Sequence, residues 1–512
     1  MNRISRPLSL FIGMLAVYFI FLAFLIFRSN YVMMDTVWTL WHQAEPHTVF
    51  HYWNIQGRAL SGRLFQWLFS KADKIANIRF IRLLSWAGWV GFCALLYRVF
   101  KRVQRSGNLD SGEWTIRLTV VFTASCLSVV LYIGWAGCCE TFIPALLSLT
   151  AGLLLFEQTM GGGTASTKGG GAPTIQSALR IPFWSATLAL ALGVVSLFFY
   201  QSCYPFLLLP FYCVYLNRKD GKFTAPMLAA MFYFFAGLAV YYVLFRYSLH
   251  VSGFKPSERT VLRLDPLDRL SFFFSYPMNQ AFSLNFFFDT KSGLSQAVFP
   301  VLMTAWVLFT FLYRKGPFLV RLRYVLGMVF WWMLGFLPQL IARESEAPYR
   351  TMPVLSVMVF LMIADAIGPL IKEGRAKTVL SFALALVFLV RGGYVYYSYI
   401  SQPYSEEYRT VRAAVSSKYN AHIKTVVFVL AGENGFLPRF GVYHFKDEFA
   451  MPSIHKDWTP EPLVKQLVYE LTGNRREAGM LKVSVYDKVD EIPRKSVLSD
   501  PTVLFIDAHT LF

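Results

Sequence analysis

The chain has 512 residues, of which 55% are hydrophobic, 17% are aromatic and only 15% are charged. A mean hydropathy of +0.44 over this length excludes a water-soluble globular protein and predicts a polytopic membrane protein that lies in a lipid bilayer. The formal net charge of +19 does not indicate a nucleic-acid partner, because many basic residues separate apolar runs and do not gather on one soluble face.

The first apolar run, residues 8–27, follows a basic flank and is longer than the core of a typical signal peptide. No small-residue cleavage site follows it, so it is expected to remain as a membrane-spanning helix. About eleven runs are long enough to cross a bilayer of about 30 Å, and the sixth of them is the shortest. They lie at 8–27, 80–100, 118–135, 142–157, 181–199, 205–216, 226–246, 296–313, 324–341, 351–371 and 378–398.

Lysine and arginine are divided unequally between the loops at the two ends of these runs. The loops on the amino-terminal side hold most of them, whereas the short opposite loops, 136–141, 200–204 and 342–350, hold only Arg343 and Arg350. Basic loops stay on the cytoplasmic side of a membrane, so the amino terminus is predicted to lie in the cytoplasm.

An odd number of spans places the long loops 28–79 and 247–295, and everything after about residue 399, on the outer face. The loop 247–295 alternates charged residues with phenylalanine-rich stretches, which is typical of a segment lying in the headgroup layer. It is expected either to cover a lipid-binding groove or to form a structural interfacial helix.

The carboxyl-terminal region alternates short strand-like and helical patterns. Strands are predicted at 425–430, 481–486 and 503–506, and helices near 406–419 and 462–471. The predicted fold is therefore an all-α polytopic membrane domain of about eleven helices, residues 1–400, followed by a small α/β domain, residues 401–512, on the outer face.

The six cysteines lie within or next to apolar runs, with no CxxC pair and no histidine at metal-ligand spacing. They are predicted to be small core residues. The alternative is a disulfide between Cys138 or Cys139 and Cys203 outside the membrane.

Two acidic residues stand where apolar runs end, and a carboxylate at membrane depth is by default a functional hypothesis. Asp35 lies eight residues beyond Phe27, next to several tryptophans, and is predicted to be a general base; the other interpretation is a turn residue facing the interface. Glu140 lies in the short loop 135–141 with no lysine or arginine nearby. It is expected to orient an acceptor, to help bind a divalent metal ion, or to be a simple loop acid.

Several polar residues of the predicted outer loops have the chemistry to bind a phosphate or a sugar. Arginine forks match phosphate oxygens and stay charged when desolvated, although interfacial arginines also anchor helices by snorkelling. Tyr200 and Gln201, after the fifth span, offer a phenol and an amide to a sugar. The other candidates are Arg58, Arg63, Arg343, Glu344, Tyr349 and Arg350.

Together these residues supply a carboxylate to deprotonate an acceptor hydroxyl and arginines to stabilise a departing phosphate. The pattern resembles the GT-C superfamily of integral membrane glycosyltransferases, and within it the bacterial and phage glucosyltransferase family that decorates O-antigen. The resemblance rests on Asp35 after the first span, on Trp53 to Leu60 with its Gly-Arg-x-Leu, on Tyr200-Gln201 after the fifth span and on Tyr349-Arg350 before the tenth. Many members of the superfamily have two adjacent acids in the first loop, whereas Asp35 stands alone between Met34 and Thr36.

The resemblance implies transfer of a hexose, such as glucose, from a polyprenyl-phosphate donor to a glycan or lipid acceptor on the outer face of a bacterial cytoplasmic membrane. It assigns Asp35 as the base, Glu140 as the second acid, and Arg58, Arg63, Arg343 and Arg350 as phosphate contacts. It implies no nucleotide, no nucleic-acid partner and no definite cofactor, with a divalent metal ion as an option. Three alternatives are a transporter or flippase of lipid-linked saccharides, a glycan polymerase or ligase, and a non-catalytic assembly subunit.

Overall fold

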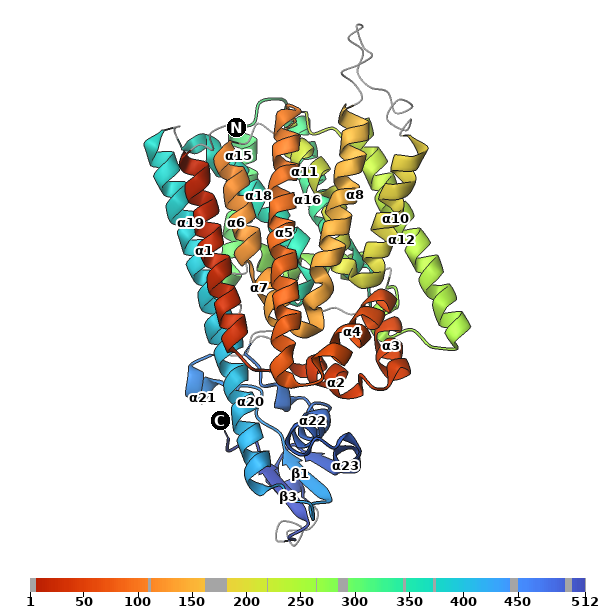
Figure 1. Ribbon diagram of the computed structural model, residues 1–512. Coiled ribbons are helices and arrows are strands. Elements are labelled where there is room, and N and C mark those ends of the chain that lie inside the picture. The colour runs from red at the N-terminus through yellow and green to blue at the C-terminus, as the bar shows by residue number, and fades with distance from the viewer. Residues whose placement is uncertain are drawn as a thin grey trace.

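The structure is a computed structural model in which a helical bundle carries a small α/β region at one end (Figure 1). It describes residues 6–108, 112–161, 182–218, 220–263, 265–283, 293–343, 347–371, 374–442, 450–492 and 500–511.

Six helical stretches in the described residues are long and apolar enough to cross a membrane, or seven if the bent pair α6 and α7 counts as one span. All eleven predicted runs coincide with helical elements. The runs that do not belong to these six or seven stretches fall on shorter helices. The six stretches are Pro7–Arg28, Ile75–Arg105, Ala136–Met160, Ala225–Ser252, Phe318–Gly335 and Arg375–Lys418. The structure is therefore compatible with an all-helical membrane fold that has six or seven long apolar helical stretches.

The bundle is built from the following elements, most of them apolar on several faces as expected for helices packed in lipid and against one another. They are α1 (Arg6–Arg28), α5 (Ile78–Arg105), α6 (Glu113–Ser125), α7 (Leu127–Gly134), η2 (Ala136–Thr141), α8 (Phe142–Gly161), α10 (Phe183–Phe199), η4 (Gln201–Leu208), α11 (Leu209–Leu216), α12 (Ala225–Ser252), α15 (Gly293–Tyr313), α16 (Phe318–Gly335), α17 (Leu337–Leu340), η6 (Tyr349–Thr351), α18 (Pro353–Ile367), η7 (Gly368–Leu370) and α19 (Arg375–Val395).

The long first loop, 28–79, is itself helical. It forms α2 (Met34–His42), α3 (Pro46–Asn54), α4 (Ala59–Ala72) and η1 (Ile75–Asn77), which lie together at the end of the bundle next to the carboxyl-terminal region (Figure 1). Arg82 of α5 fixes the start of this loop, because its buried guanidinium donates to the carbonyl oxygens of Ser29 (2.7 Å) and Tyr31 (3.1 Å). These carbonyls follow α1 and have no partner within that helix, so Arg82 holds the chain where it turns toward Asp35.

The second long loop, 247–295, forms η5 (Glu258–Thr260), α13 (Pro266–Ser275) and α14 (Pro277–Phe282) in its described part. Phe272 and Phe273 are buried against Phe336, so these two rings pack against protein. Residues 284–292, which include the second phenylalanine run, lie outside the described residues.

The carboxyl-terminal region has the predicted strands and helices. β1 (Thr425–Val429) is the middle strand of a parallel sheet in the order β2-β1-β3, pairing Thr425 with Lys482 of β2 (Lys482–Tyr486) and with Val503 of β3 (Val503–Asp507). Its other elements are the π-helical turn η8 (Tyr396–Ser401), α20 (Gln402–Lys418), α21 (Leu437–Phe440), η9 (Ser453–His455), α22 (Pro460–Thr472), α23 (Arg475–Gly479) and η10 (Val489–Glu491). α19 passes through η8 into α20 without a linker, so the expected boundary near residue 400 falls inside continuous helix.

One hydrophobic core joins this region to the helices of the first loop, because buried residues such as Trp41, Phe69 and Leu467 belong to the same cluster. Asp73 is the polar centre of this contact: its carboxylate accepts hydrogen bonds from Tyr469 (2.8 Å) and from Gln43 (3.2 Å). The segment that bears Asp35 is therefore held from both sides, by the bundle and by the carboxyl-terminal region.

All six cysteines are buried and unbonded, which matches the prediction of small core residues; no disulfide joins Cys138 or Cys139 to Cys203.

Candidate functional site

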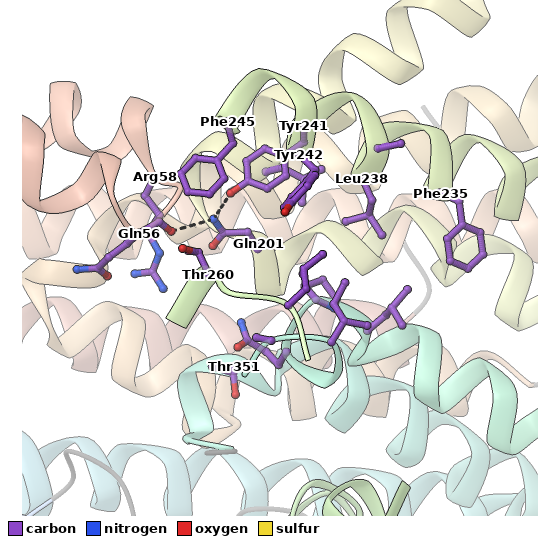
Figure 2. Close-up of a pocket in the computed structure, with 18 of the residues that line it drawn as sticks. Gln56, Arg58, Gln201, Phe235, Leu238, Tyr241, Tyr242, Phe245, Thr260 and Thr351 are labelled. Carbon is purple, nitrogen blue, oxygen red and sulfur yellow. Dashed lines mark hydrogen bonds between the residues drawn. The ribbon is translucent and has the colours of Figure 1, made fainter. Parts of the chain in front are cut away.

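A cavity of about 400 Å³ opens between α12 and the segments around α17 and η6. Arg58, Gln56 and Gln201 lie at one end of it, whereas Leu238 and Phe235 lie further along α12 (Figure 2). Other polar residues of the lining are Gln339, Thr260, Thr351 and Arg350. A ligand that fits such a space has a polar, negatively charged head and an apolar body.

The polar end is built on a tight turn at Gly57, between α3 and α4. Gly57 has φ +76°, and a Cβ there would lie 2.1 Å from the Tyr241 hydroxyl oxygen, so the position requires glycine. The Gly57 carbonyl oxygen accepts hydrogen bonds from Tyr241 (3.0 Å) and from the Gln201 amide (3.1 Å), and the Gln201 amide lies 2.7 Å from the Tyr241 hydroxyl. Gln201 therefore braces the turn that presents the next residue, Arg58.

Arg58 is the residue at the amino-terminal cap of α4 and lines the cavity. Its guanidinium carbon lies 4.3 Å from the centroid of the Tyr200 ring, which makes a cation–π contact with a fully buried tyrosine. The Arg58 Nε is buried and has no hydrogen-bond partner among the described residues. A buried guanidinium donor without a partner indicates a place where an anion or water binds.

Arg350 lines the same cavity from the opposite wall. Its carbonyl oxygen accepts hydrogen bonds from the hydroxyls of Tyr132 and of Tyr200, the second at 3.2 Å, and its guanidinium carbon lies 5.4 Å from the Trp135 ring centroid. Tyr200 thus contacts both arginines, by its ring face to Arg58 and by its hydroxyl to the backbone of Arg350.

Glu140, in η2, is 1% exposed and accepts a hydrogen bond from Ser61 of α4 at 3.0 Å through Oε1. Its second oxygen, Oε2, is buried without a hydrogen-bond partner in the part of the chain that the structure describes. Burial disfavours the ionised form of this side chain, and the nearby charge of Arg58 opposes that effect only in part. Glu140 is therefore a carboxylate with one oxygen fixed and one available inside the protein.

Asp35 lies in the first turn of α2 and is half-buried. The Tyr52 hydroxyl donates to its Oδ1 at 3.4 Å. The neighbouring residue, Thr36, accepts a hydrogen bond from the Gly137 backbone N–H at 3.2 Å, which joins α2 to η2.

Cys138 lies within electrostatic range of both the arginines and the carboxylates. Four charged side chains exert an electrostatic effect on its buried thiol: Glu140, Arg350, Arg58 and Asp35. Residues from α2, from the turn before α4, from η2 and from η6 thus come together at one end of the bundle, although more than 300 positions separate Asp35 from Arg350.

The remaining predicted residues lie elsewhere. Arg63 is exposed and stacks on Phe50, with 4.2 Å between its guanidinium carbon and the ring centroid. Arg343 is exposed and lies 3.9 Å from Glu258 as an ion pair. Tyr349 is buried in the core, and Glu344 falls outside the described residues. None of the first three lines the cavity.

Four residues at or near the cavity were not predicted from the sequence: Tyr241, Gln56, Gln339 and Trp135. Tyr241 lies inside an apolar run, where nothing in the pattern separates a tyrosine that points to a site from one that packs in the core. Glycine followed by arginine at 57–58 was the local signal for the turn, and its partners come from elements far away in the sequence.

The described residues hold no group of three or more histidine, cysteine, aspartate or glutamate side chains placed to bind a metal ion. The chain matches no protein-family model, no curated protein and no solved structure. The chemistry of the cluster itself is therefore the basis for a functional proposal.

Proposed function

We propose that the protein is a membrane glycosyltransferase of the GT-C type, which transfers a hexose, such as glucose, from a polyprenyl-phosphate donor to a glycan or lipid acceptor. The observation that carries this proposal is an amphipathic cavity lined by two arginines, Arg58 and Arg350, with an apolar wall from α12. Asp35 and Glu140 are not among its lining residues, but both act on the same buried Cys138 thiol as the two arginines.

In this proposal the lipid chain lies along α12, where Leu238 and Phe235 line the cavity. The phosphate binds Arg58 and Arg350, because guanidinium groups pair with phosphate oxygens at two points. Many outward residues of α12 are apolar and exposed, which suits a helix that faces lipid and admits a lipid tail from the side. Examples are Phe232 (61% exposed), Val243 (66%) and Tyr247 (66%).

The reaction requires three events at the polar end. An acceptor hydroxyl oxygen forms a bond to the anomeric carbon, the bond from that carbon to the phosphate oxygen breaks, and the hydroxyl proton passes to Asp35. Arg58 and Arg350 stabilise the negative charge that grows on the departing phosphate. The available oxygen of Glu140 is suited to hold a second hydroxyl of the acceptor or the sugar.

The proposal includes eleven membrane spans, with the amino terminus in the cytoplasm of a bacterium and the site on the outer face of the cytoplasmic membrane. The support is the unequal division of basic residues between the loops and the position of α2, α4 and α20 at one end of the bundle (Figure 1). Six of these spans are the long apolar helical stretches described above. The other five would be the bent pair α6 and α7, counted as one span, and the shorter helices α10, α11, α15 and α18.

The test uses purified protein in lipid nanodiscs with polyprenyl-phosphate hexose carrying a radiolabel in the sugar, and an extracted bacterial glycolipid fraction as acceptor. We expect label to enter the acceptor from the lipid-linked donor and not from a nucleotide sugar, and Asp35→Asn to abolish the transfer. Movement of the labelled lipid across a membrane without any labelled product would contradict the proposal and favour a flippase.

A further inference from the structure

A second lipid-facing groove lies between α1 and α19, at the edge of the bundle opposite to α12 (Figure 1). Its volume is about 790 Å³, and its lining is almost entirely apolar, with Val17, Phe21 and Val390 among the residues. Gly13 forms part of its floor, and a Cβ at that position would meet no atom within 4 Å. The groove therefore has the shape and polarity to hold a hydrocarbon chain along the two helices.

A polar cavity of about 760 Å³ adjoins this groove, and Tyr397 lines both spaces. It lies where α1 ends and α20 begins. Three arginines line it, together with hydroxyl and amide side chains, and no aspartate or glutamate is among the lining residues. The arginines are Arg28, Arg409 and Arg412.

The charge of this polar cavity is strongly positive. Outside the lining, Glu406 forms ion pairs with both Arg409 and Arg439, and Glu470 contacts the Tyr408 hydroxyl. No described carboxylate pairs with Arg28, which stacks on Phe24, or with Arg412, which donates to the Tyr408 hydroxyl at 3.1 Å.

A buried hydroxyl adds a donor to the same space. Ser405 lines the polar cavity, and its Oγ is buried without a hydrogen-bond partner among the described residues. Guanidinium groups together with a hydroxyl donor make a site for a phosphate group.

We propose that the groove and the polar cavity together bind one anionic phospholipid of the leaflet nearest the carboxyl-terminal region. One acyl chain lies between α1 and α19, and the phosphate contacts Arg28, Arg412 and Ser405. A headgroup with an ammonium group is disfavoured, because the cavity offers that cation no carboxylate. The lipid joins the bundle to α20, and this binding site does not depend on the proposed glycosyl transfer.

The test measures lipid retention by native mass spectrometry after the full-length protein is exchanged from detergent into dioleoyl phosphatidylglycerol or dioleoyl phosphatidylethanolamine. We expect wild-type protein to retain phosphatidylglycerol preferentially and the double variant Arg28→Gln with Arg412→Gln to retain about tenfold less. The matched control is Arg246→Gln on α12, an exposed arginine outside both cavities, which should retain as much as wild type.

A second variant separates the lipid from a free anion. Gly13→Leu fills the groove without touching the arginines, so it should lower phosphatidylglycerol retention while thermal stabilisation by inorganic phosphate stays as in wild type. Three results would overturn the proposal: equal retention of both phospholipids by wild type, unchanged retention by the arginine and Gly13→Leu variants, or stabilisation by inorganic phosphate without any bound phosphatidylglycerol.

Discussion

The cavity beside α12 and the groove between α1 and α19 are both apolar spaces that lead to arginines at the same end of the bundle, yet they differ in one respect. Neither the α12 cavity nor the polar cavity beside the groove has an acidic residue in its lining. The carboxylates Asp35 and Glu140, however, act on the same buried Cys138 thiol as the two arginines of the α12 cavity. Arginines alone bind an anion. Arginines beside carboxylates bind an anion and also move a proton, which is why we assign chemistry to the first space and retention of a lipid to the second.

Substitution of Asp35 is the strongest way to break this comparison. Asp35→Asn keeps the size of the side chain and removes the base, so the rate of hexose transfer should fall by about 10²- to 10⁴-fold. The control is Glu45→Gln, an exposed acid of the same loop, which should transfer at the wild-type rate. Equal rates for Asp35→Asn and Glu45→Gln would remove Asp35 from the reaction.

Substitution of Arg58 tests the binding half of the same space. Arg58→Ala removes the buried guanidinium, and a lost hydrogen bond to a charged group corresponds to a fall in kcat/KM of about 10- to 100-fold. The control is Arg63→Ala, which removes an exposed side chain five residues away. Its kcat/KM should stay near the wild-type value. If both variants lose the same activity, the general positive charge of the loop matters and the cavity does not.

The Gly57 turn offers a smaller, structural test. Gly57→Ala places a Cβ against the Tyr241 hydroxyl in a left-handed conformation, so it should destabilise the protein by about 1–3 kcal/mol and weaken donor binding. Gly253→Ala also has positive φ, but its Cβ meets no atom within 4 Å. It should lose only about 1 kcal/mol in thermal unfolding and should bind the donor normally.

The smallest expected effect concerns the contact that ties the carboxyl-terminal region to the first loop. The hydrogen bond to Asp73 raises the pKa of Tyr469 above its usual value. The folded state then holds the phenol proton more tightly, so this stabilisation is present below a pH of about 10 and is lost as the pH rises through the raised pKa. The melting temperature of the wild type should fall as the pH rises above about 10. In Tyr469→Phe this fall should be smaller, whereas in the control Tyr247→Phe on α12 it should equal that of the wild type.

Much of the fold could be predicted from local patterns. The apolar runs coincide with helices, and the strands at β1, β2 and β3 follow short β-branched stretches, because periodicity and composition act over neighbouring residues. The helical structure of the first loop was not predicted, since α2, α3 and α4 owe their stability to burial against η2 and the carboxyl-terminal region, which no local pattern reports.

The candidate site could be predicted only in part. Asp35, Glu140, Arg58, Tyr200, Gln201 and Arg350 lie at one end of the bundle, and each stood out as a polar residue of a predicted outer loop. Arg63 and Arg343 satisfied the same rule and lie on the surface. The side of a helix that faces the cavity depends on contacts between distant segments, such as the one that Gln201 makes with Gly57.

The most direct test of the central claim is a cryo-electron microscopy structure of the Asp35→Asn variant in nanodiscs that contain polyprenyl-phosphate hexose. The account predicts the phosphate within about 3 Å of guanidinium nitrogens of Arg58 and Arg350, the polyprenyl chain along α12 and the sugar facing residue 35. A phosphate bound only by Arg28 and Arg412, with the α12 cavity lacking lipid, would contradict it.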